Sequence, residues 1–153
     1  MTSTYDISNK IVSFLKTKLR SVKDIKATPE AVFAPTIYDL TGPDTIVLVW
    51  YDSTAQHIDS RPRQENGNPV AGSFISKHLR FVVSIGFRSM SEAPNMDKII
   101  EAIELNLTNY DIPGIAPLKP SGISRITVDP NKVYWRQIWF DTIDKLDIAI
   151  HTN

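Results

Sequence analysis

The fold is decided by the stretch LRFVVSIGF, which runs from Leu79 to Phe87. In an extended strand, successive side chains point to opposite faces of the sheet. One face would therefore carry only apolar side chains: Leu79, Phe81, Val83, Ile85 and Phe87. The other face would be mixed, with Arg80, Val82, Ser84, Gly86 and Arg88. The apolar face indicates that helices pack on this side of the sheet and form the core with it. The mixed composition of the other face indicates that it is partly covered rather than fully exposed to solvent.

Two amphipathic helices are predicted to supply that core. The first has one apolar stripe at helical spacing: Ile7, Ile11, Phe14, Leu15, Leu19 and Val22. Ser3, with Asp6 three residues later, has the spacing of a capping box and would begin this helix. The second helix, over residues 96–109, has the stripe Met96, Ile99, Ile100, Ile103 and Leu107. Asn95 would be its N-cap.

Further strands are predicted on both sides of the decisive stretch. Residues 45–51 form a continuous apolar run, which is typical of a central strand. Residues 125–128 and 133–140 would form a hairpin around a type I turn at Asp129-Pro130-Asn131-Lys132. Residues 52–73 are predicted to be a long loop, which could contain a small hairpin at Asn66-Gly67. Residues 112–120 would be a loop pinned by prolines.

These elements predict an α+β fold. Residues 1–153 would form a single domain. Its mixed or antiparallel sheet would have about four to six strands. The two main helices would pack on one face of that sheet, through stripes that include Ile11, Leu15, Ile99 and Ile103.

Composition narrows the function classes. The 153 residues include 17 basic and 17 acidic side chains, and this zero net charge argues against an electrostatic nucleic-acid binder. There is no cysteine, which excludes disulfides and a cysteine nucleophile. The start of the chain has no basic and apolar leader, and its longest apolar run, residues 46–51, is too short to span a bilayer. We therefore expect no signal peptide, no membrane partner and synthesis in a cytoplasm.

No pattern of residues predicts catalysis or metal binding. His57, His78 and His151 are scattered and have no ligand partner at helical or hairpin spacing. Acidic residues recur at every third position in Asp141, Asp144 and Asp147. On a strand, this spacing places successive side chains on opposite faces of the sheet, so the three carboxylates would not converge on one metal ion. We therefore expect no catalytic residue, no metal and no cofactor, and a protein that is not an enzyme.

Two groups of residues are candidates for contacts with other molecules. Tyr134, Trp135 and Trp139 place large aromatic area on the last strand, and Trp and Tyr are enriched at interface hot spots. Core packing alone would also explain them. Arg61, Arg63 and Lys77 flank the long loop and would be either solvated charges or a basic lip facing phosphates.

The order of segments resembles that of a known protein family. The relevant segments are VWYD at 49–52, LRFVVSI at 79–85, IELNL at 103–107, GIAPLKP at 114–120 and VYWRQIWF at 133–140. Together they resemble the tail-terminator, or tail completion, proteins of long-tailed phages, especially the Mu-like contractile-tail group, over about residues 30–145. The most specific piece is the Pro-Leu-x-Pro loop followed by the aromatic strand. One departure is Asn109-Tyr110 directly after the second helix, where a glycine is expected, although Asn can adopt the left-handed cap conformation.

The resemblance implies a structural role in the virion. Tail terminators are small α+β subunits that form a hexameric ring, cap the finished tail tube and sheath, and join the tail to the head connector, while genomic DNA passes through the hole. On this chain the candidate interface residues are Pro117, Leu118, Pro120, Tyr134, Trp135 and Trp139. The DNA-facing residues of the lumen would be Arg61, Arg63 and Lys77. The protein would assemble in the host cytoplasm and end in the phage tail.

Three alternatives remain open at this point. The chain could be another small head-tail connector, sheath-associated or tail-assembly protein, a distinction that gene neighbourhood would resolve. It could be a small enzyme with a dispersed carboxylate site. It could also be a monomeric ligand-binding module, which a mass measurement in solution would separate from a ring.

Overall fold

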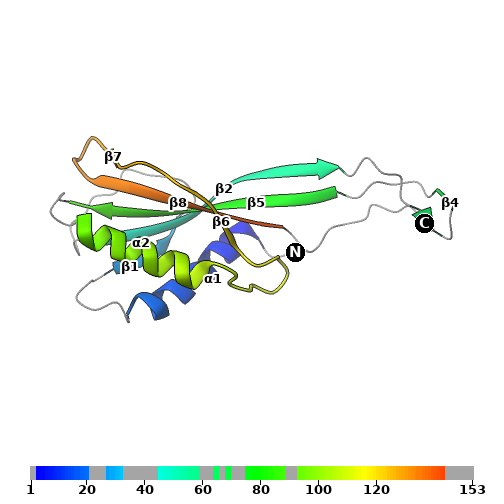
Figure 1. The fold of residues 1–153 in the computed structure, drawn as a ribbon, viewed down its shortest axis with the longest axis horizontal. Helices are drawn as coiled ribbons and strands as arrows, with labels where there is room; N and C mark the ends of the chain where they lie inside the picture. Colours follow the sequence, from blue (N-terminus) through cyan, green and yellow to red (C-terminus); the bar gives the residue numbers. More distant parts are fainter. Residues whose placement is uncertain are drawn as a thin grey trace.

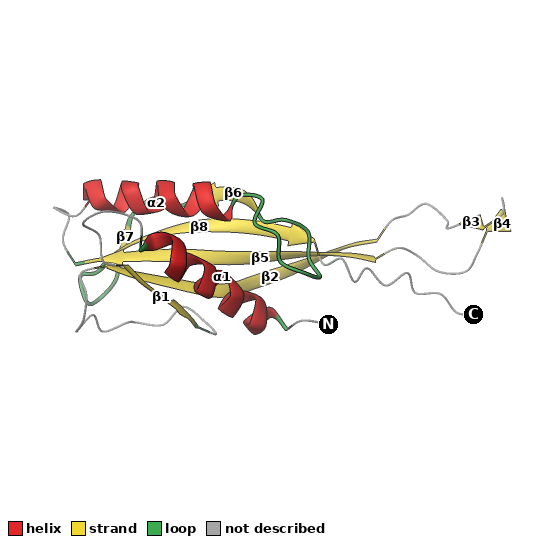
Figure 2. Ribbon diagram, turned by 90° about the horizontal axis from the view of Figure 1, so that it is seen from below, coloured by secondary structure: helices red, strands yellow, loops and turns green. Residues whose placement is uncertain are grey.

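The computed structural model describes residues 3–20, 27–32, 45–58, 64–65, 68–69, 75–88 and 93–143 of the 153-residue chain. In these residues, two helices lie on one side of a twisted six-stranded sheet (Figures 1 and 2). This arrangement confirms the predicted α+β fold.

The elements follow one another along the chain in this order: α1 (Thr4–Leu19), β1 (Ala27–Ala31), β2 (Thr45–Ile58), β3 (Gln64–Glu65), β4 (Asn68–Pro69), β5 (Ile75–Phe87), α2 (Ala93–Leu107), β6 (Lys119–Ile123), β7 (Thr127–Val128) and β8 (Tyr134–Ile143). The strand order in the main sheet is β1-β2-β5-β8-β6, and β7 also pairs with β8. The sheet is mixed because β1 runs parallel to β2, whereas the other pairs are antiparallel. Strand β5 lies at its centre.

Both helices bury their apolar stripes against the same face of the sheet. Four residues of these stripes, Ile11, Leu15, Ile99 and Ile103, are 0% exposed. They pack in one cluster with the alternating apolar side chains of β5, as the sequence predicted. Val22, the last residue of the predicted first stripe, lies outside the described residues.

The ends of the helices follow local sequence signals. The amide of Asp6 donates to Ser3 Oγ over 3.1 Å, which confirms Ser3 as the N-cap of α1. After α2, Asn109 has φ 64° and its amide donates to the Leu118 carbonyl over 2.8 Å. Asn109 thus adopts the left-handed conformation in place of a glycine. The prediction of Asn95 as an N-cap is wrong, because α2 begins at Ala93.

The tight turn between β7 and β8 lies where the sequence predicted it. The Asp129 carboxylate oxygen Oδ1 accepts hydrogen bonds from the amides of Asn131, over 2.8 Å, and Val133, over 2.9 Å. The Lys132 amide donates to the Asp129 carbonyl over 3.0 Å, and Lys132 has φ 61°. One aspartate therefore holds both the tip of the turn and the start of β8.

The predicted long loop is partly wrong, because residues 52–58 belong to β2. Strands β2 and β5 stay paired as far as Ile58 and Ile75, whereas β8 ends at Ile143 opposite His78. The result is a two-stranded arm that projects beyond the rest of the sheet (Figure 1). The sequence of the arm is polar, and this polarity suggested a loop. Strands β3 and β4 pair with each other where the small hairpin was expected.

Two edge strands contain prolines and were not predicted. Pro29 lies in β1, and Pro120 lies in β6 rather than in a loop. An edge strand tolerates proline because one side of its backbone needs no partner. The last strand ends at Ile143, and its suggested continuation to Ile150 lies outside the described residues.

Candidate interaction surface

The sheet face opposite the helices forms a second apolar cluster, here called the tryptophan face. It consists of Ile46, Leu48, Trp50, Val82 and Val133, with Trp135 and Trp139 packed against them. Strand register aligns two rows across it, Trp50–Val82–Trp139 and Ile46–Gly86–Trp135. Within the described part of the chain, no helix packs on this face (Figure 2). The mixed second face predicted from β5 therefore carries an apolar cluster that includes three tryptophans.

Two tryptophans of this face lie over glycines of neighbouring strands. A Cβ atom on Gly86 would be 2.7 Å from the indole ring of Trp135, and one on Gly122 would be 2.9 Å from that of Trp139. Such packing of an aromatic ring on a strand glycine covers the exposed backbone. Each indole is half-buried, with one part against the sheet and the remainder accessible. The tryptophan face therefore presents two partly exposed indole rings that are packed on strand glycines.

The Asp129 carboxylate fixes the position of Trp135. The indole Nε1–H donates to Asp129 Oδ2 over 2.9 Å, while the other carboxylate oxygen caps the turn. Burial raises the pKa of Asp129, but the hydrogen bonds from Trp135, Val133 and Asn131 outweigh this effect and leave the pKa below its ordinary 3.8. The ionised form is therefore the one that the fold favours.

We expect Asp129→Ala to destabilise the protein by about 1–3 kcal/mol, because it removes hydrogen bonds to a charged acceptor. The contribution from ionisation is fully present above the unfolded-state pKa, and it is lost as the pH falls through the lower folded-state pKa. Urea unfolding at pH 7 and near pH 3 measures both effects. Asp129→Asn keeps an acceptor for the indole but carries no charge. Its free energy of unfolding should therefore fall less between pH 7 and pH 3 than that of the wild type. Equal acid sensitivity of the two proteins would contradict this role.

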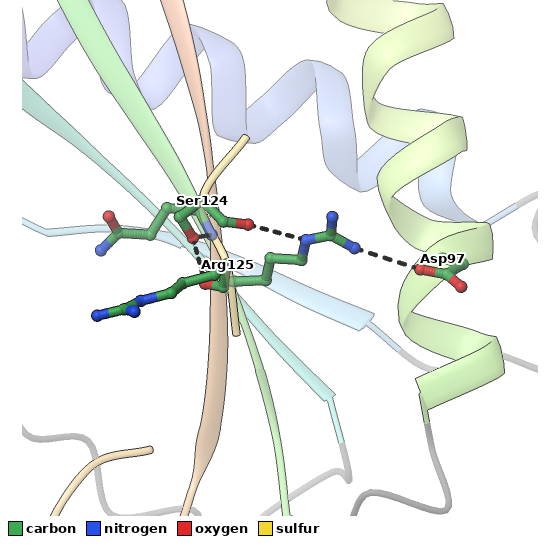
Figure 3. Close-up of polar contacts among 5 residues, drawn as sticks. Asp97, Ser124 and Arg125 are labelled. Carbon is green, nitrogen blue, oxygen red and sulfur yellow. Dashed lines mark hydrogen bonds and ion pairs between the residues drawn. The ribbon is translucent and has the colours of Figure 1, made fainter. Parts of the chain in front are cut away.

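An arginine ties α2 to the outer strands on the helix side. Arg136 Nε donates to the Ser124 carbonyl over 3.0 Å, and its Nη1 donates to Asp97 Oδ1 over 3.4 Å (Figure 3). The Ser124 hydroxyl accepts from the Gln137 amide over 2.9 Å and donates to the Arg125 carbonyl over 2.8 Å. These contacts hold the segment between β6 and β7 in place, and the Arg125 side chain extends away from α2 (Figure 3).

The segment that Arg136 holds carries exposed apolar side chains. Ile123 is 40% exposed, Ile126 is 36% exposed and Val128 is 57% exposed. We call these three residues the β6–β7 edge. Exposed basic residues accompany them at Lys119, Arg125 and Lys132. Clustered apolar side chains with a polar rim are typical of protein–protein contact sites.

The structure distributes the predicted interface residues over different surfaces. Tyr134 pairs with Phe87 and lies on the helix side, whereas Trp135 and Trp139 lie on the tryptophan face. Pro120 is exposed on the edge strand β6, and Pro117 is half-buried. Leu118 is 0% exposed in the helix-side core, so its side chain is not available for contacts in this fold. The sequence could not reveal its burial because the surrounding loop has no period.

The predicted basic group is only partly described. Lys77 is half-buried on the arm and lies opposite Gln56, whereas Arg61 and Arg63 lie outside the described residues. At the base of the arm, Arg80 donates to both carboxylate oxygens of Asp141, over 2.9 and 3.3 Å. The hydrogen bond and the charge of Asp141 raise the pKa of Arg80. Both side chains are well exposed, so the pair contributes little stability.

Beside this ion pair is a hollow of about 300 Å³, lined by Ser53, Ala55, His78, Leu79, Arg80 and Asp141. Among the described residues, including those of this hollow, no group of three or more His, Asp or Glu side chains is arranged to hold a metal ion. Asp144, Asp147 and His151 lie outside that part of the chain. The described helices include none long and apolar enough to cross a bilayer.

Comparison with known proteins gave no further guide to function. Neither a scan against models of protein families nor a search of curated proteins found a match.

Proposed function

We propose that this protein is a structural, ring-forming tail terminator of a long-tailed phage, with no catalytic activity. In this role, copies of the chain form a ring that caps the tail tube and sheath and joins them to the head-tail connector. The ring is a hexamer, and genomic DNA passes through its lumen. The protein assembles in the host cytoplasm and remains in the phage tail.

The observation that carries the assembly role is the tryptophan face. Trp135 and Trp139 are held over Gly86 and Gly122 and remain partly exposed. Rigid, partly exposed aromatic side chains are the kind that contribute most to protein–protein contacts. The projecting arm and the exposed apolar residues of the β6–β7 edge also favour contacts with other subunits. The phage-tail context comes from the resemblance in segment order.

The mass of the purified protein in solution tests the ring. Analytical ultracentrifugation should give one closed assembly whose mass is an integral multiple of 17.2 kDa. A mass of 17.2 kDa at every concentration, both alone and with tail tubes present, would rule out the ring. A series of ever larger species would also contradict it, because an open chain does not close.

The same proposal places Arg61, Arg63 and Lys77 near the lumen. Passing DNA needs weak phosphate attraction that is independent of sequence, and a few cations on each subunit can supply it. We expect the triple change to Glu to leave ring formation intact and to impair DNA retention or ejection in assembled particles. The same change in Lys10, Lys16 and Lys18, exposed on α1, is the charge-matched control. If DNA retention and ejection were unaltered, the prediction that these residues face the lumen would be wrong.

A further inference from the structure

The tryptophan face is buried unevenly. Leu48 is 2% exposed and Trp50 is 4% exposed, although no described helix lies over this face (Figure 2). Trp135 and Trp139, on the β8 side of the same face, remain partly exposed. Neighbouring side chains on a sheet cover one another's flanks but leave the outer ends open. The half of the face that β2 forms therefore has a cover that the β8 half lacks.

The connection between β1 and β2 leaves and rejoins the sheet beside the covered half. Strand β1 ends at Ala31, and β2 begins at Thr45. Val32 donates its amide to the Val49 carbonyl over 2.9 Å, and its side chain packs against the cluster of the tryptophan face. Residues 33–44, here called the crossover segment, lie outside the described residues. The structure therefore fixes the two positions that this segment must join.

The crossover segment is longer than the path it must bridge. Strands β1 and β2 are parallel and adjacent, with Ala31 opposite Val49. The chain must therefore return along about four residues of strand, or roughly 13 Å, to reach Thr45. A segment of this length can extend to about 40 Å. It also has the apolar side chains needed to cover a sheet, which are Phe33, Ile37, Tyr38 and Leu40.

Helix α1 occupies the opposite face at this position. It packs on both β1 and β2, and its residues Ile11 and Leu15 lie in one cluster with Val47 and Val49 of β2. A return path on the helix side would have to compete with α1 for the same surface. The tryptophan face has no such competitor among the described elements.

The handedness of crossovers leads to the same face. Strands β5 and β6 both run antiparallel to β8, so they are parallel to each other, and α2 connects them across the helix side. The steps from β5 to β6 and from β1 to β2 go in the same direction along the order β1-β2-β5-β8-β6, but β2 runs antiparallel to β5. Reversing the strands while keeping the direction of the step reverses the hand of a crossover on a given face. Because such crossovers are right-handed in about 98% of cases, the two must lie on opposite faces.

From these features we infer that the crossover segment runs over the tryptophan face and docks on its β2 half. Its four large side chains supply the cover over Leu48 and Trp50. The β8 half, with Trp135 and Trp139, is left as the part of this face that another protein can contact. The inference does not depend on the proposed ring, but it confines a subunit contact on this face to the β8 half.

Hydroxyl-radical footprinting read by mass spectrometry tests the cover, because it reports each of the three tryptophans separately. In the wild type, Trp50 should be oxidised several-fold more slowly than Trp135 and Trp139. Replacing the four large side chains of the crossover segment by serine should raise the rate at Trp50 several-fold and leave the other two rates unchanged. The control within the same segment is Thr36→Ala with Asp39→Ala, which should leave all three rates unchanged.

A nitroxide label tests whether the crossover segment itself is the cover. The chain has no cysteine, so Leu40→Cys gives a single attachment site. In a background with Trp135→Phe and Trp139→Phe, Trp50 is the one remaining tryptophan, and this label should quench its fluorescence. The same label at Lys10→Cys, which is exposed on α1 on the helix side, should leave the fluorescence unquenched.

Far-UV circular dichroism checks that the variants fold, and the wild-type footprint needs none of them. Equal oxidation rates at the three wild-type tryptophans would overturn the inference, and so would a folded serine variant that keeps the slow rate at Trp50. Quenching that arises only between a labelled copy lacking Trp50 and an unlabelled reporter would show that a second copy is the cover, which also overturns it. A protein that forms no ring would overturn the proposed function and leave this inference intact.

Discussion

Replacing Ile103 by alanine should lower the free energy of unfolding by about 2–5 kcal/mol, the range for large-to-small changes in a packed core. Ile103 is 0% exposed and lies in the cluster that joins α2 to the central strand β5. The change removes buried methyl and methylene groups and leaves a cavity that the rigid helix and sheet cannot fill. Urea unfolding followed by circular dichroism measures the loss.

The matched control is Leu105→Ala on the same helix. Leu105 is 75% exposed, so its truncation should change the free energy of unfolding by less than about 0.5 kcal/mol. The helix propensities of the two parent residues are similar enough for the comparison. If the two variants lost equal stability, the assignment of the buried stripe of α2 would be wrong.

Replacing Gly86 by alanine should lower the free energy of unfolding by about 1–3 kcal/mol, as expected for overpacking a fitted site. The added Cβ would lie 2.7 Å from the Trp135 ring, which is too close for any carbon contact. The ring must move off the sheet, and its hydrogen bond to Asp129 is then lost or strained. Tryptophan fluorescence and urea unfolding follow the two consequences separately.

A double-mutant cycle with Trp135→Ala isolates this contact. Without the indole, the extra methyl of Gly86→Ala meets no ring, so its destabilising effect should largely disappear. Additive losses in the two single variants and the double variant would show that the indole does not rest on Gly86.

The central elements of the fold could be predicted because their buried apolar residues recur at a regular spacing in the sequence. Every second residue from Leu79 to Phe87 is buried against the helices, and the stripes through Ile11 and Ile103 meet them. Local signals were also sufficient at Ser3, Asn109 and the turn at Asp129. In each case the side chain or backbone preference acts within a few residues, so no knowledge of distant contacts was needed.

The edges and the arm could not be predicted for the opposite reason. Strand β6 contains Pro120 and Gly122, both of which weaken a strand assignment. Its pairing with β8 is what defines it as a strand, and that pairing is visible only in the structure. Residues 52–58 are mostly polar, although they pair with β5. Such strands are defined by their neighbours rather than by their own period.

The candidate surfaces show the same division. The aromatic composition of β8 indicated Trp135 and Trp139, but only the structure reveals the glycines beneath them and the hydrogen bond that Trp135 donates to Asp129. The β6–β7 edge was missed because isolated residues such as Ile123 and Val128 form no pattern in the sequence. Its signal is the exposure of its apolar side chains, and one of them, Ile123, lies on strand β6, which the sequence did not predict.

The most direct test of the central claim is negative-stain electron microscopy of the protein alone and mixed with tail tubes. We predict ring-shaped particles in the first sample and a ring at one end of the tubes in the second. Leu105→Asp, at a position 75% exposed on α2, is the control and should form both. Tubes with bare ends at saturating protein, or rings that never meet a tube, would contradict a tail terminator.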